Sequence, residues 1–312
     1  MKSISRLIVT LLLILWTSPC VSKEKAFIAC IKSGDLSPYN TALEGFVQGL
    51  EEAGFDVWLN SYTTKEEAVV KKILEKKPAL VLALGSDASK LAKERIAGKI
   101  PVLFSMVLNP VSTGLLKSMD TPEPNFTGVS LDIPPYLQFA KLQALLPKAK
   151  KLGVIYNPSS SGLIIQQARR EATSLGLELI EKRVTKASDV PAALKSLRGE
   201  CDALWMVPDP VVYSSKSAEY VLLFTLRHSI PFIGISANWV KAGALSAVSC
   251  DYRDIGLQGA EQASKILRGT PPQEIPPAIP RKTYLSINLK TAQRLNVKIP
   301  KDLLAEAKEI IR

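Results

Sequence analysis

The chain contains very little histidine and cysteine. Among its 312 residues His228 is the one histidine, and the four cysteines show no CxxC spacing. This excludes an HExxH metalloprotease helix, a zinc site with several histidine ligands and a thioredoxin-like motif. The sequence also lacks a GxxxxGK[ST] loop, a GxGxxG turn after its first predicted strand and a GxSxG elbow. We therefore expect no metal, no cofactor and no enzymatic activity.

Long runs of like charge are also missing. Lysine and arginine number 40 against 29 aspartates and glutamates, a net charge of +11, but no run of five or six like charges occurs. A nucleic-acid-binding arm is therefore not expected. With 46% hydrophobic residues the chain can bury one or two full cores, which excludes intrinsic disorder for most of its length.

The one long apolar run lies at the N-terminus. Lys2 and Arg6 precede an apolar segment over residues 7–16, and a proline and small residues follow, which is typical of a secretory signal peptide. The run is about half the roughly 20 residues of a membrane-spanning helix. We predict a signal peptide over residues 1–22 and a soluble protein of the periplasm.

The cysteines leave two questions open. Lipid anchoring at Cys20 fits the sequence poorly, because Pro19 directly precedes it and Thr17 stands where a lipoprotein site has a leucine-like residue. A disulfide between Cys201 and Cys250 is compatible with an oxidising compartment, but the sequence alone does not establish it.

Beyond residue 23, short apolar runs alternate with amphipathic segments. Continuous apolar runs such as residues 79–84 are typical of strands buried on both faces of a parallel sheet. The predicted elements are strands over 26–31, 56–59 and 79–84, a helix carrying Leu43, Phe46, Val47 and Leu50, and a second helix that starts at a capping box of Thr64 and Glu67 and ends near Lys76.

The same order of elements recurs about 120 residues later. The matched segments are 54–59 with 176–180, 63–64 with 185, 78–81 with 202–205, 85–87 with 208–210, and 100–104 with 230–234. Each unit reads β-α-β-α-β, which predicts an open, doubly wound parallel sheet. The fold class is therefore α/β, with two doubly wound parallel-sheet lobes joined by a hinge.

The chain is expected to pass between the lobes more than once. The predicted lobe 1 comprises residues 23–128 and 252–280, and lobe 2 comprises 129–251 and 281–312. The predicted crossings are an extended stretch over 127–131 and a second near 245–251. A helix over 254–267, an extended proline-rich connection over 271–280 that is not a domain linker, a last strand over 284–289 and a terminal helix over 301–311 complete the chain.

Ligands of open α/β sheets bind beyond the carboxyl ends of the strands. The residues expected there, which we take as the ligand-binding set and which are polar except for Met106, are Ser33, Ser86, Asp87, Met106, Asn109, Asn157, Ser161, Asp209, Ser236, Asn238 and, at the hinge, Asp251. Such small polar groups suit a compact polar ligand held by hydrogen bonds. Ser86, Ser161 and Asp209 also suit helix caps, and Asn109 and Asn157, each before a proline, also suit turns.

Several segments in this order resemble a known family. They are residues 78–81, 100–102, 109–111 with 114–115, 125–130 (NFTGVS), 146–147, 153–158, 243–245, 251–252 with 256, 263 with 265–267, and 287–292. The chain resembles the type I periplasmic binding proteins of ABC transporters, specifically the tryptophan/tyrosine-type group. The resemblance implies a monomeric receptor that closes two lobes over a small molecule, delivers it to a membrane permease, and uses every residue of the ligand-binding set except Ser33.

Two segments depart from that family. Leu108-Asn109-Pro110 stands where Thr-Asp-Pro is common, and Ser236-Ala237-Asn238 stands near a usual acidic residue. A buried α-ammonium group needs a carboxylate partner, so these changes bear on an amino-acid ligand. Asp209 and Asp251 are the candidate replacements, and Tyr39, Tyr213 and Trp239 are candidates for an aromatic wall.

Two other functions remain open at this level. The same fold can present a bound signal to a membrane sensor kinase. A secreted hydrolase that uses Asp209 and Asp251 as paired carboxylates is the third class, although nothing in their sequence setting favours it.

Overall fold

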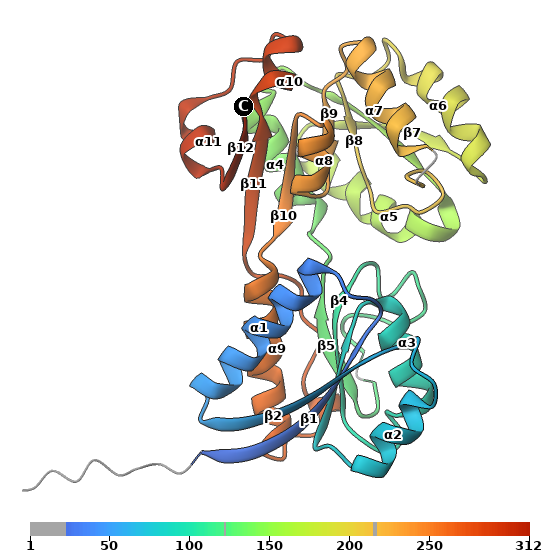
Figure 1. Cartoon of the computed structure of the whole chain (residues 1–312). Helices are drawn as coiled ribbons and strands as arrows, with labels where there is room; N and C mark the ends of the chain where they lie inside the picture. The colour runs from blue at the N-terminus through green and yellow to red at the C-terminus, as the bar shows by residue number, and fades with distance from the viewer. Residues whose placement is uncertain (1–22, 122, 215–216) are drawn as a thin grey trace, which may run out of the picture.

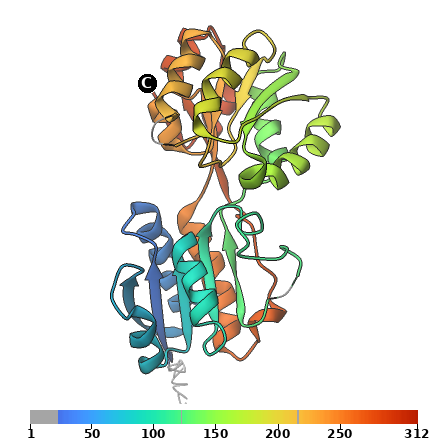
Figure 2. The ribbon, with the colours of Figure 1, turned by 90° about the vertical axis from the view of Figure 1, so that its right-hand side faces the viewer.

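The computed structural model describes residues 23–121, 123–214 and 217–312, which form two lobes (Figure 1). The predicted signal peptide and Cys20 lie outside the described residues. Figure 2 shows the lobes stacked with a narrow connection between them. None of the described helices combines the length and the hydropathy that crossing a bilayer requires.

Lobe 1 is built on a fully parallel sheet of five strands. Its strand order is β2-β1-β3-β4-β5. The strands are β1 (Glu24–Lys32), β2 (Phe55–Thr63), β3 (Leu80–Leu84), β4 (Val102–Val107) and β5 (Phe126–Ser130). Side chains of β1 alternate between two cores: Ile28 and Cys30 face one, Ala29 and Ile31 the other. The run is apolar throughout because both faces are covered by helices.

The helices of lobe 1 lie on both faces of this sheet. They are α1 (Ser37–Glu52), α2 (Val69–Lys76), α3 (Ser86–Arg95) and α9 (Tyr252–Leu267). Helices α1 and α9 touch so closely that a Cβ atom on Gly256 would lie 2.0 Å from the carbonyl oxygen of Ala42. Only glycine permits that approach, which fixes the returning helix α9 onto lobe 1.

Lobe 2 repeats the strand order of lobe 1 and extends it. Its order is β7-β6-β8-β9-β10-β11-β12, in which the first five strands follow the pattern of lobe 1. The strands are β6 (Lys151–Tyr156), β7 (Glu178–Arg183), β8 (Ala203–Trp205), β9 (Phe232–Gly234), β10 (Ser246–Cys250), β11 (Thr283–Asn288) and β12 (Glu309–Ile311). The predicted internal repeat is confirmed. Strand β11, however, runs antiparallel to β10, so the second sheet is mixed.

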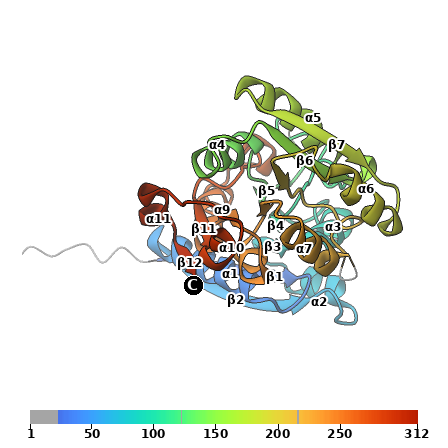
Figure 3. The ribbon, with the colours of Figure 1, turned by 90° about the horizontal axis from the view of Figure 1, so that it is seen from above.

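The helices of lobe 2 are α4 (Pro135–Leu145), α5 (Pro158–Ser174), α6 (Val190–Leu197), α7 (Ala218–Arg227), α8 (Ala237–Ala242), α10 (Leu289–Arg294) and α11 (Lys301–Glu306). Two 3-10 turns, η1 (Ala187–Asp189) in lobe 2 and η2 (Pro272–Glu274) in lobe 1, complete the elements. From above, β12 and α11 lie on the opposite side of lobe 2 from β7 and α6 (Figure 3).

Three segments connect the lobes. Most of the stretch 127–131, predicted as an extended crossing, belongs to the buried strand β5 of lobe 1, and the chain passes to lobe 2 from Leu131 onward. It returns at Asp251, between β10 and α9, and crosses again between Ala278 and β11. Ala278 pairs with Gly128 and Ser130 in lobe 1, and the carbonyl of Lys282 accepts from the N–H of Asp251, so the crossings are held to one another.

Two local predictions were wrong. The helix after β2 begins at Val69 with Ala68 in the left-handed region, because the carboxylate of Glu66 accepts from the N–H of Thr63 and closes a turn instead of the predicted capping box. The predicted terminal helix stops at Glu306, and residues 309–311 add β12 to the open edge of β11. The disulfide between Cys201 and Cys250, which the sequence left open, does not form in the structure, where both cysteines are free.

Candidate ligand-binding cleft

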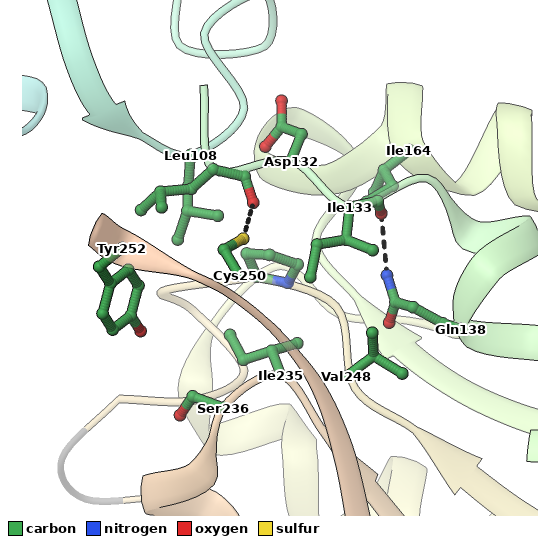
Figure 4. A pocket seen from close by; sticks show the side chains of 12 residues that line it. Leu108, Asp132, Ile133, Gln138, Ile164, Ile235, Ser236, Val248, Cys250 and Tyr252 are labelled. Carbon is green, nitrogen blue, oxygen red and sulfur yellow. Dashed lines mark hydrogen bonds between the residues drawn. The ribbon is translucent and has the colours of Figure 1, made fainter. Parts of the chain in front are cut away.

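A cavity of about 230 Å³ lies between the lobes, where the hinge segments cross (Figure 4). Its lining residues come from both lobes and from the hinge: Leu108, Leu131, Asp132, Ile133, Gln138, Ile164, Pro208, Ile235, Ser236, Val248, Cys250 and Tyr252. Most are apolar. We call this cavity the hinge pocket.

The hinge pocket continues into a wider groove of about 530 Å³ between the lobes. The groove is bordered by the loop after β4 in lobe 1 and by α5 in lobe 2. Asp132, Ile133 and Ile164 line both spaces and so mark the junction between them. A ligand bound here would contact both lobes, which closure of the lobes requires.

Asp132 is the one acidic residue that lines the hinge pocket. It follows β5 on the first hinge segment and stands at the edge of the pocket (Figure 4). Its Oδ1 accepts from the backbone N–H of Asn109 at 2.8 Å, and among the described residues no other donor reaches the carboxylate. Burial raises the pKa of Asp132 to about 6, against the smaller opposing effect of that hydrogen bond. The carboxylate therefore has acceptor positions available to a ligand.

The polar wall of the pocket inside lobe 2 is Gln138. This buried side chain donates to the carbonyl of Ile133 at 2.9 Å and accepts from the indole N–H of Trp205 at 2.9 Å. On the hinge, the thiol of Cys250 donates to the carbonyl of Leu131 at 3.3 Å. Burial and the nearby carboxylates raise the pKa of Cys250 to about 12, so the thiol stays protonated.

Asp209, a member of the predicted ligand-binding set, lies 4% exposed in the turn after β8. Its Oδ2 accepts from the N–H of Asn157 at 2.7 Å and from the hydroxyl of Ser161 at 2.9 Å. Its Oδ1 accepts from the N–H groups of Val211 and Val212 at 3.0 and 3.1 Å. Four donors thus satisfy this carboxylate within lobe 2.

Asn157 and Ser161 belong to the same network. The side chain of Asn157 caps α5 by accepting from the N–H groups of Ser159 and Ser160, and it donates to the carbonyl of Val184. The hydroxyl of Ser161, fully buried, also donates to the carbonyl of Pro208 at 2.9 Å. Asn157, for which the alternative was a turn, is thus the N-cap of α5, whereas Ser161, for which the alternative was a cap, lies within the first turn of that helix. Contact of either residue with a ligand remains a prediction.

In lobe 1, Ser33, Ser86 and Asp87 gather at the start of α3. The hydroxyl of Ser33 accepts from the N–H of Ala88 at 2.9 Å. Ser86 and Asp87 are exposed and line a separate pocket of about 140 Å³ beside α3. Burial and the charge of Asp87 raise the pKa of Tyr39, whose ring lies against the same turn.

Two predicted residues adopt left-handed backbone conformations, Met106 within β4 with φ 62° and Asn109 after it with φ 51°. Met106 is buried in the core at a shift of register between β4 and β5. Asn109 lines the groove. Positive φ is uncommon for residues other than glycine and concentrates at functional sites.

The last three predicted residues lie in different settings. Ser236 lines the hinge pocket, whereas Asn238 is exposed on α8. Asp251 caps α9 and pairs with Lys308 at 3.3 Å. Burial acts to raise the pKa of Asp251, but the N–H of Asp254 and the ammonium of Lys308 outweigh it and lower the pKa.

The proposed aromatic wall does not form as one unit. Tyr213, Phe232 and Trp239 pack together in lobe 2, with Tyr213 and Trp239 centroids 5.6 Å apart, while Tyr39 lies in lobe 1. The hydroxyl of Tyr213 is buried, finds no hydrogen-bond partner among the described residues, and has a raised pKa because of that burial and the charge of Asp209.

Sequence reasoning missed Asp132. The residue stands one position beyond the predicted crossing over 127–131, and an acidic residue next to a predicted crossing is a signal that the sequence contains. Among the described residues, no three His, Cys, Asp or Glu side chains gather as metal ligands.

Comparison of the sequence with known proteins gives two findings. The sequence model of one family, described as ABC transporter substrate binding protein, matches residues 32–311. A protein of Clostridioides difficile named tyrosine-binding protein is 29% identical over 289 residues, which cover 88% of this chain and 82% of that protein. Both findings concern almost the whole described chain.

Solved structures share the fold. A ligand-free, open structure of a substrate-binding protein with adhesive properties from Clostridium difficile has a TM-score of 0.78 at 24% identity, covering 92% of this chain and 99% of that one. A Streptococcus pneumoniae protein solved in complex with L-Trp has a TM-score of 0.70 at 22% identity, covering 92% of this chain and 100% of that one.

Proposed function

The chain belongs to the family of ABC transporter substrate-binding proteins, which are binding proteins rather than enzymes and act outside the cytoplasm, and from this premise we propose that it is the receptor of an importer for a free aromatic amino acid. The receptor closes its two lobes over the amino acid and presents it to a membrane permease. The ligand class is supported by the names of two similar proteins, one tyrosine-binding and one solved with L-Trp.

The observation that carries this proposal is the position of Asp132. An α-ammonium group taken out of water needs a compensating charge, and Asp132 is the one carboxylate that lines the hinge pocket. The departures at Asn109 and Asn238 therefore do not remove the amino acid as a ligand, because Asp132 replaces the acids missing there.

The rest of the pocket suits the remainder of such a ligand. Ile133, Ile235 and Val248 offer apolar contact area to a side chain, and Tyr252 adds an aromatic ring from the hinge. Ser236 and Gln138 are the polar groups available for orientation. A mostly apolar pocket with few polar groups is the common form of small-molecule sites.

The cellular setting follows from the same premise. We assign residues 1–22 to a signal peptide and the mature chain to the periplasm, as a monomer, since docking on a permease requires both lobes to be accessible. The partner is then an ABC permease.

The test is calorimetric titration of residues 23–312 with L-tyrosine, L-tryptophan and L-phenylalanine, and with the same rings lacking the amino group. We expect binding of at least one amino acid and none of its deaminated analogue at the same concentration. Equal binding of both would contradict the assignment of Asp132. A ligand at 100 times its Kd also adds about 2.7 kcal/mol to the free energy of unfolding, visible as a higher Tm.

Transport is tested separately, by uptake of the radiolabelled amino acid in cells with and without the gene. We expect uptake to fall when the gene is removed. Unchanged uptake by cells that carry a binding-competent receptor would contradict the importer role and favour a sensing module.

A further inference from the structure

Asn109 takes part in four hydrogen bonds through its backbone N–H, its carbonyl and its side-chain amide. Its N–H donates to Oδ1 of Asp132 at 2.8 Å, and its carbonyl accepts from the N–H and hydroxyl of Thr113 at 2.9 and 3.0 Å. Its side-chain Nδ2 donates to the carbonyl of Pro208 at 3.2 Å. Asn109 lies in lobe 1, in the loop after β4, and Pro208 lies in lobe 2, in the loop after β8.

The bond to Pro208 is unusual in its location. Within residues 23–121, 123–214 and 217–312, it is the one side-chain hydrogen bond that joins the lobes directly without involving a hinge segment. Its acceptor is well fixed, because the carbonyl of Pro208 also accepts from the buried hydroxyl of Ser161, which is held by Asp209. The amide of Asn109 therefore connects the loop after β4 in lobe 1 to a hydrogen-bonded segment of lobe 2.

We propose that Asn109 is a positioning residue that tethers the two lobes through its bond to Pro208 and so limits how far the ligand-free cleft opens. The same residue holds the carboxylate of Asp132 through its backbone N–H, so the tether and the ammonium site move together. The effect on ligand affinity rests on the proposed function; the effect on the ligand-free shape does not.

The chemistry of this position requires an amide. Nδ2 supplies a proton to the carbonyl oxygen, whereas a carboxylate of the same shape would place two acceptors opposite each other. It would also add a second negative charge near Asp132. The tether is lost in both Asn109→Gly and Asn109→Asp, and both residues tolerate the left-handed backbone at φ 51°.

A tether changes affinity through the population of nearly closed molecules. If the lobes open further without it, a smaller fraction of the protein is ready to bind, and the apparent Kd rises by that factor. One neutral hydrogen bond corresponds to a change of about fivefold. Both variants should weaken binding of the wild-type ligand. Asn109→Asp should weaken it less than Asn109→Gly only if the added carboxylate attracts the ligand ammonium directly.

The experiment measures the radius of gyration by small-angle X-ray scattering, with and without saturating amino acid, and the Kd by calorimetry. The matched control is Asn296, also left-handed at φ 53°, exposed in lobe 2 and without a side-chain hydrogen bond among the described residues. We expect Asn109→Gly and Asn109→Asp to enlarge the ligand-free radius, leave the liganded radius unchanged and, for Asn109→Gly, raise the Kd about fivefold. Asn296→Gly and Asn296→Asp should match the wild type.

Wild-type radii for the ligand-free Asn109 variants would overturn the tether. A higher Kd without a larger radius would also overturn it, because Asn109 would then contact the ligand directly. If no aromatic amino acid binds the wild type, the proposed function fails, while the ligand-free radii still decide the tether.

Discussion

Two carboxylates near the cleft have opposite surroundings. Asp209 accepts hydrogen bonds from four donors of lobe 2, whereas Asp132 accepts from one, the N–H of Asn109. Asp209 belongs to one lobe, and Asp132 belongs to the hinge that both lobes share. The sequence drew attention to Asp209, but the structure shows that Asp132 has the unoccupied acceptor positions.

The difference distinguishes an acid that the fold satisfies from the acid that we propose binds a ligand. A buried charge is stabilised by the hydrogen bonds that replace its water, and when these come from the protein the residue maintains the fold. When most are absent, burial disfavours the charged form and raises the pKa, as at Asp132. In the function proposed above, a ligand ammonium supplies the missing interaction. The following predictions test this contrast.

Removing Asp209 should cause the largest change. Asp209→Ala leaves four donors without their charged acceptor, so we expect the free energy of unfolding to fall by about 4 kcal/mol. Urea unfolding followed by circular dichroism measures it. A loss below about 1 kcal/mol would show that this network is not structural.

Removing the charge of Asp132 should affect binding instead of folding. Asp132→Asn is expected to weaken amino-acid binding at least 100-fold, about 2.7 kcal/mol, because the ammonium loses its partner. Since the raised pKa means that the ionised acid is less favourable in the folded state, the Tm at pH 7 should be unchanged or higher. Unchanged affinity in calorimetry would show that an acid other than Asp132 binds the ammonium group.

The pH dependence of binding should report the same carboxylate. The pKa of Asp132 is raised to about 6 in the ligand-free protein, so the acid is ionised at pH 7 and mostly protonated at pH 5. Because the ammonium binds the ionised form, affinity should fall about tenfold between these values. Titrations across this range measure it, with Asp251, whose pKa is lowered, contributing no change there. A flat profile would show that Asp132 does not bind the charged group.

Ser161→Ala should have the smallest effect. The hydroxyl donates to Asp209 and to the carbonyl of Pro208, both of which keep other partners. We expect a loss of about 1 kcal/mol in the free energy of unfolding and little change in Kd. A Kd more than tenfold higher at an unchanged Tm would instead place Ser161 in contact with the ligand.

Much of the fold could be predicted because it depends on local pattern. The continuous apolar run over residues 80–84 is typical of a strand covered on both sides, and the structure buries all of it. The repeated order of segments likewise led to two sheets with the same strand order. Where the prediction was wrong, a distant partner decided: residues 309–311 became a strand because β11 left an edge free for pairing.

The sequence by itself determined that this protein has two α/β lobes, polar residues at the carboxyl ends of its strands, and no recognisable catalytic motif. The tertiary structure alone decided which of these polar residues are satisfied within the fold and which line the hinge pocket. Whether a carboxylate is satisfied depends on donors far away in sequence: Asp209 meets Asn157, 52 residues distant, while Asp132 meets Asn109 across the hinge. The availability of a charge is set by the geometry of folding, because hydrogen bonds and burial are formed only when these segments meet.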